Sequence, residues 1–104
     1  MKLTSGKLYC STEHCLILYP ERRMAISARR TSPKTAAGFE NLSPKDNRIV
    51  LGYWITHLST ELYLINEKQP FLFLKEDGRY IHVLAEEKTG WVINDSWLKL
   101  KEVK

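Results

Sequence analysis

Residues 89–101 read TGWVINDSWLKLK, and this stretch decides the fold that the sequence predicts. Its β-branched and aromatic residues favour a short strand, its central Asn-Asp-Ser run favours a single polar turn, and its alternating leucines favour a second short strand. We expect Gly90 to permit a close backbone approach, and Trp91 or Trp97 to anchor the core. We interpret the stretch as the closing seam of a small β-barrel.

A meander of strands leads into this seam. The sequence predicts strands at residues 70–75, 80–84 and 91–93, where apolar residues dominate. The first connection, residues 76–79, contains an Asp-Gly pair that suits a tight hairpin turn. We expect the second turn at residues 86–90.

The run from residue 69 to residue 103 resembles the Src-homology-3-like barrels, particularly their bacterial branch. In that family, meandering strands are followed by a Gly-Trp-Val motif, a short polar turn with an aromatic residue, and a final strand. Those elements are here Gly90-Trp91-Val92, residues 94–98 and residues 99–101. The resemblance implies a mainly β fold, a small antiparallel Src-homology-3-like β-barrel with a long inserted loop, in which residues 6–10 form a first strand beside the last.

Three departures from the family pattern bear on function. Eukaryotic members bind polyproline through an Ala-Leu-Tyr-Asp-Tyr stretch, a paired tryptophan and a proline in the last turn. This chain has Lys-Leu-Tyr-Cys at residues 7–10, Arg79-Tyr80 in place of the paired tryptophan, and Ile93 in place of the proline. These departures argue against polyproline recognition, so we expect specificity to reside in the inserted segment.

The first part of the chain predicts two strands and a basic edge. Residues 6–20 favour a hairpin whose strands are joined by the polar residues 11–14, and Pro20 ends the second strand. In residues 21–32 apolar side chains alternate at 24, 26 and 28 between arginines, which we interpret as a basic edge strand.

The middle of the chain predicts a long loop and then more strand. Turn-forming residues dominate 32–47, and we place a long basic and polar loop at about residues 28–48. Residues 49–58 are β-branched and aromatic, which favours a strand. Residues 59–66 predict a short strand or a turn.

Length and composition predict a single β-barrel domain over residues 1–104. The chain has a mass of 12.1 kDa and is 43% hydrophobic, enough for one core. The N-terminus has no apolar run typical of a signal peptide, and no window reaches the length of a membrane span. We therefore expect a cytoplasmic protein that does not enter a membrane.

The net charge of +4 comes from one short segment. Residues 21–34 contain five cations and one acid, so they account for the whole excess, and such a segment could track a phosphate backbone. The candidate anion or nucleic-acid contacts are Arg22, Arg23, Arg29, Arg30 and Lys34. The competing interpretation is a solvated edge and loop.

Cys10, His14 and Cys15 have the chemistry of zinc ligands, but no fourth ligand follows from their spacing. On a strand His14 and Cys15 would point to opposite faces, which is unsuitable for a Cys-His nucleophile pair. Whether the two cysteines form a disulfide stays open. We predict no metal, no cofactor and no catalytic activity.

The leading functional hypothesis is a non-catalytic module that docks a protein partner through an aromatic face and the long basic insertion. The candidate contact residues are Tyr53, Trp54, Tyr80, Trp91 and Trp97. The alternative is a small nucleic-acid-binding β-barrel that uses the basic segment from Arg22 to Lys34.

Overall fold

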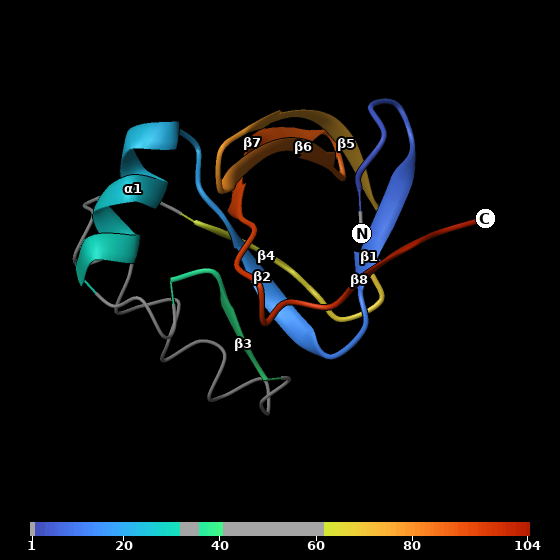
Figure 1. Ribbon diagram of the computed structural model, residues 1–104, viewed down its shortest axis with the longest axis horizontal. Helices are drawn as coiled ribbons and strands as arrows, with labels where there is room; N and C mark the ends of the chain where they lie inside the picture. The colour runs from blue at the N-terminus through green and yellow to red at the C-terminus, as the bar shows by residue number, and fades with distance from the viewer. Residues whose placement is uncertain (1, 32–35, 41–61) are drawn as a thin grey trace.

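The computed structural model describes residues 2–31, 36–40 and 62–104 (Figure 1). The elements of this part of the chain are β1 (Leu8–Ser11), β2 (His14–Leu18), α1 (Arg22–Thr31), β3 (Gly38–Glu40), β4 (Tyr63–Ile65), β5 (Phe71–Asp77), β6 (Tyr80–Ala85), β7 (Lys88–Ile93) and β8 (Leu100–Glu102). No helix among these residues is long and apolar enough to cross a membrane.

The strands form two antiparallel sheets, so the mainly β prediction is confirmed. One sheet has the order β7-β6-β5-β1-β8 and arches over the other, which has the order β3-β2-β4 (Figure 1). The sheets are joined beyond β2, where Tyr19 and Trp91 exchange backbone hydrogen bonds of 2.8 and 2.7 Å. The predicted closed barrel is wrong, because the outer strands β7 and β8 do not pair with each other and β2 pairs within the second sheet.

The meander and the seam are where the sequence placed them. β5, β6 and β7 pair in succession, and β8 pairs with β1, so the first strand does lie beside the last. The second turn is shorter than predicted, because Ala85 pairs with Lys88 and leaves only Glu86 and Glu87 to turn the chain. Both have positive φ, 46° and 69°, the backbone of a tight hairpin.

The segment predicted as a basic edge strand is the helix α1, and the strand prediction is wrong. The buried positions are Ala25 and Ala28, three residues apart, which is helical spacing. Alanine and arginine are also strong helix formers, and Arg29 and Arg30 lie in the last turn, where cations favour the helix dipole.

Residues 6–20 form two strands, but the predicted hairpin is wrong. β1 belongs to the five-stranded sheet and β2 to the three-stranded sheet, so the bend at Thr12 and Glu13 carries the chain from one sheet to the other. β2 lies between β3 and β4, and Cys15 through Leu18 are all buried. Cys10 and Cys15 are both buried thiols, and no disulfide joins them.

The middle of the chain falls partly outside the described residues. Of the predicted loop at 28–48, residues 28–31 belong to α1 and residues 38–40 to β3. The predicted strand at 49–58 lies outside the described residues. In the segment 59–66, β4 supplies the short strand that the sequence suggested.

The core lies between the two sheets, and neither seam tryptophan belongs to it. Trp91 is half-buried and packs against the core without being one of its buried residues, and Trp97 is 37% exposed, so neither is a fully buried core anchor. The largest fully buried side chains are Tyr9, Tyr19, Phe71, Leu16, Ile17, Ile65, Ile81, Ile93, Val83, Val92 and Cys15.

Gly90 does permit a close approach, as the sequence predicted. A Cβ at this position would lie 2.6 Å from the backbone oxygen of Tyr19 and 2.8 Å from Cγ of Leu18. Only glycine therefore fits between β7 and the end of β2 without a shift of the backbone.

Candidate binding face

The five-stranded sheet has one face on the core and one face toward solvent. On β6, Ile81, Val83 and Ala85 are buried, whereas Tyr80, His82 and Leu84 alternate with them and are half-buried. We call the side of the sheet that carries Tyr80, His82 and Leu84 the outer face. Residues paired with them in register share that face.

An aromatic row crosses the outer face at its middle. Lys75 of β5 pairs with His82 of β6, which in turn pairs with Trp91 of β7. The His82 and Trp91 rings stack with centroids 4.8 Å apart, and Lys75 Nζ lies 5.6 Å from the Trp91 centroid. Trp91 is half-buried, so its ring contacts both His82 and Lys75 and is still partly accessible.

An apolar row lies beside the aromatic row. Leu8 of β1 pairs with Leu72 of β5, Leu72 pairs with Leu84 of β6, and Leu84 pairs with Thr89 of β7. Leu72 and Leu84 are half-buried, and Leu8 is 43% exposed. Leucines at neighbouring positions on paired strands form a contiguous apolar surface instead of isolated apolar side chains.

α1 borders the outer face at its Tyr80 end. Arg22 Nε lies 2.7 Å from a carboxylate oxygen of Asp77, and the Arg22 guanidinium lies 5.2 Å from the Tyr80 centroid. α1 also packs against β7, and Ile93, the partner of Tyr80 in register, is fully buried. Among the predicted aromatic contacts, Tyr80 is therefore the residue whose ring α1 contacts.

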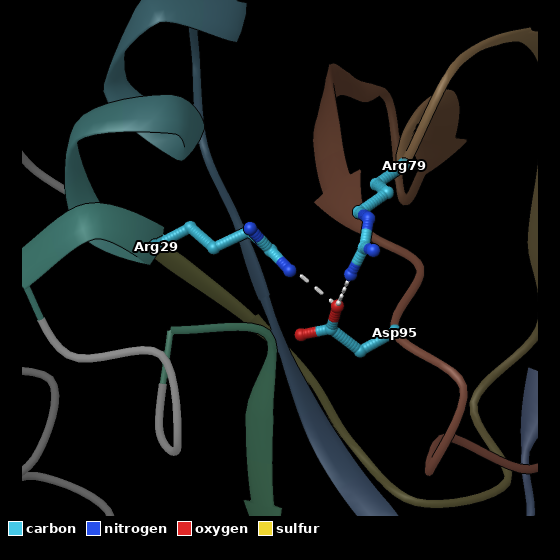
Figure 2. Close-up of polar contacts among 3 residues, drawn as sticks. All are labelled: Arg29, Arg79 and Asp95. Carbon is cyan, nitrogen blue, oxygen red and sulfur yellow. Dashed lines mark hydrogen bonds and ion pairs between the residues drawn. The ribbon is translucent and has the colours of Figure 1, made fainter.

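A buried carboxylate holds the other end of α1. The Asp95 side chain is 10% exposed, and its Oδ1 lies 3.4 Å from Arg29 Nε and 3.6 Å from a terminal nitrogen of Arg79. Figure 2 shows the two guanidinium groups approaching this one oxygen from α1 and from the β5–β6 turn. Two cations on one buried carboxylate fix the position of the helix against the meander.

The helix divides the predicted basic patch. Arg22 and Arg29, seven residues apart, share one side of α1 and are engaged by Asp77 and Asp95. Arg23 and Arg30 share another side and are exposed, with Arg23 paired to Glu21 at 2.8 Å. Three of the four arginines thus contact carboxylates of this chain, and Lys34 lies outside the described residues.

Trp97, another predicted aromatic contact, is not part of the aromatic row. Trp97 lies in the connection between β7 and β8, where its ring meets the edge of His14 with centroids 4.9 Å apart. Tyr53 and Trp54 lie outside the described residues. Of the three predicted aromatic contacts that the structure describes, Trp91 alone lies in the aromatic row.

The sequence reasoning missed most of the outer face. Lys75, His82 and the leucines of the apolar row lie in segments predicted as strands, but they are not among the predicted contact residues. Alternation along the strand was the available signal, because residues 80, 82 and 84 must share a face of β6. Pairing across strands was needed to show that Leu8 continues the same surface.

Burial argues against Cys15 as a nucleophile. Burial raises the pKa of the Cys15 thiol above its usual value, which favours the protonated, weakly nucleophilic form. Among residues 2–31, 36–40 and 62–104, no three side chains of His, Cys, Asp or Glu are grouped as metal ligands.

Comparisons of the chain with protein families, with curated proteins and with solved structures found no match.

The His82 stack predicts a measurable pH dependence. Burial, and then the charge of Lys75, lowers the pKa of His82 below its ordinary value of 6.5. The unfolded chain then binds the proton more readily than the folded chain, so the free energy of unfolding decreases as the pH falls below about 6.5 and recovers above it. We expect a His82→Gln variant to lose this part of the pH dependence in urea unfolding between about pH 5 and pH 7.5. Parallel pH profiles for the variant and the parent chain would contradict this assignment.

Proposed function

We propose that the protein is a non-catalytic binding module that docks a partner protein on its outer face. The observation that supports this proposal is the combination of a half-buried Trp91, stacked on His82, with an adjoining row of leucines on the outer face of the sheet. Tryptophan is enriched among residues that dominate binding energy, and a bordering apolar surface excludes water from such a contact.

We also propose that the scaffold is Src-homology-3-like. The proposal is supported by the β5–β6–β7 meander, by the Gly-Trp-Val sequence on β7, and by the pairing of β1 with β8. Fold alone does not assign a ligand, so the functional proposal depends on the outer face and not on this likeness.

A protein partner is better supported than nucleic acid. The arginines of α1 would serve a phosphate backbone best if they were unpaired on one side of the helix. Arg22 and Arg29 are instead held by Asp77 and Asp95, and the most exposed large aliphatic side chain of the outer face is Leu8.

Site-directed photo-crosslinking tests the docking proposal. Thr89→p-benzoylphenylalanine places a crosslinker at an exposed position on the apolar row, and Glu13→p-benzoylphenylalanine places one in the exposed bend between β1 and β2. In native lysate we expect a discrete heavier adduct from position 89 and none from position 13. We expect Trp91→Ala to lower the yield at least tenfold, which corresponds to about 1.4 kcal/mol of binding free energy.

Thermal unfolding of the Trp91→Ala variant serves as the control for folding. Adducts of equal yield from both positions, or a yield that does not change in the folded Trp91→Ala variant, would count against docking on this face.

A further inference from the structure

We propose that the segment bound on the outer face is acidic as well as apolar, and that its carboxylates are held by lysines at the β8 end of the apolar row. This inference rests on the proposed function and specifies the chemistry of the partner. Its grounds are the point at which the apolar row reaches the edge of the sheet and the lysine side chains at that edge.

The apolar row continues to the edge of the sheet. The Val103 N–H donates to the backbone oxygen of Leu8 at 2.8 Å, which places half-buried Val103 beside Leu8. The extended apolar row therefore crosses the sheet from β7 to the residue that follows β8. Its members are Thr89, Leu84, Leu72, Leu8 and Val103. Four spacings of about 4.8 Å give it a length of about 19 Å, which matches about 13 residues of helix or about six residues of extended chain.

A cavity of about 460 Å³ lies at this end of the row. Val103 lines it together with Cys10, Lys68, Lys101, Glu102 and Lys104. Cys10 pairs in register with Lys101 and is two residues from Leu8, so both belong to the outer face. Lys68 is brought there by a turn in which its N–H donates to the Ser11 oxygen at 2.8 Å.

The side chains that line the cavity include three lysines and one glutamate, so cations predominate there. Within the described residues, Lys68, Lys101 and Lys104 have no ion-pair partner, and the Glu102 carboxylate lies 3.4 Å from Lys7. Lys75 adds a further exposed cation beside Trp91 on the same face.

Two of the carboxylates around the outer face, at the ends of β5 and β6, are engaged within the chain. Asp77 is paired with Arg22, and Glu86 accepts a hydrogen bond of 2.7 Å from the Tyr63 hydroxyl. Charge complementarity therefore favours an incoming segment with Asp or Glu next to its apolar residues. A phosphate backbone would satisfy the lysines but would leave the leucines without a contact.

Selection from a phage-displayed library of random dodecapeptides tests the inference on the full-length protein. We expect enriched peptides to combine an acidic cluster with Leu, Ile or Phe, and we expect their binding to fall at least tenfold in Trp91→Ala. In the double variant Lys68→Ser, Lys101→Ser we expect the acidic enrichment to disappear. In Lys68→Glu, Lys101→Glu we expect it to invert toward basic peptides.

The matched control removes two exposed charges elsewhere. Arg23→Ser, Arg30→Ser changes the net charge by the same amount on the exposed side of α1, and we expect it to leave the acidic enrichment unchanged. Loss of the enrichment in both double variants would attribute it to net charge alone and would overturn the inference.

Three further outcomes bear on this inference and on the proposed function. Peptides that depend on Trp91 but show no acidic bias would overturn the acidic partner and leave docking intact. Failure to select any peptide that depends on Trp91 would count against both. A single-stranded oligonucleotide could also displace the selected peptides. If that displacement depends on Lys68 and Lys101, the lysines would be assigned to nucleic-acid binding instead.

Discussion

Gly90→Ala is expected to lower the free energy of unfolding by about 3 kcal/mol, the upper end of the range for an overpacked site. The added Cβ would lie 2.6 Å from the Tyr19 carbonyl oxygen and 2.8 and 2.9 Å from two carbons of Leu18. The carbonyl is backbone, and it accepts the 2.7 Å hydrogen bond from Trp91 that joins the two sheets. It cannot move without weakening that junction. Urea unfolding, followed by tryptophan fluorescence, measures the loss.

Gly78→Ala is the matched control for Gly90→Ala. Gly78 has a φ of +63° and nothing within 4 Å of an added Cβ, so alanine there meets backbone strain but no steric clash. We expect a cost of about 1 kcal/mol. If the two variants lose equal amounts of unfolding free energy, the close approach of β2 to β7 does not determine which residue fits at position 90.

Asp95→Ala is expected to lower the free energy of unfolding by about 2 kcal/mol, less than the usual cost of breaking a fully buried ion pair. The reason for the smaller value is solvent screening, since the Arg29 and Arg79 side chains are 32% and 64% exposed. The carboxylate connects α1 to the meander, so hydrogen exchange in α1 should accelerate more than exchange in β6. Urea unfolding and amide exchange measure the two effects.

A double-mutant cycle with Arg29→Ala isolates the contribution of the ion pair in Figure 2. Glu21→Ala, which removes the exposed partner of Arg23, is the control and should cost less than about 0.5 kcal/mol. Additive effects of Asp95→Ala and Arg29→Ala would show that the two side chains do not cooperate in holding the helix.

The seam and the meander could be predicted because their signals are local. Alternating apolar residues indicate a strand and its two faces, and the glycine of the Asp-Gly pair, Gly78, marks the two-residue turn between β5 and β6, where its φ is +63°. α1 was missed because Met24, Ile26 and Ala28 satisfy a period of two, while Ala25 and Ala28 satisfy the helical period. A segment of ten residues is too short for the pattern alone to decide between them.

The candidate site could be predicted only in part. Trp91 was identified from its residue type, and the grouping of positions 80, 82 and 84 follows from alternation on β6. Leu8, Val103 and Lys68 could not have been added, because they reach the outer face through strand pairing and a turn between residues distant in sequence. The pairing of Arg22 and Arg29 with carboxylates could not be predicted either, because their partners Asp77 and Asp95 lie on β5 and after β7.

The sequence by itself determined the strands of the C-terminal part, the position of their turns, and the glycine that permits contact at residue 90. The tertiary structure decided which strands pair across long separations, that β2 joins a second sheet instead of closing a barrel, and that Trp91 faces outward. The physical reason is that turn chemistry and side-chain alternation act between neighbours in the chain, whereas pairing and exposure depend on which distant surfaces exclude water together.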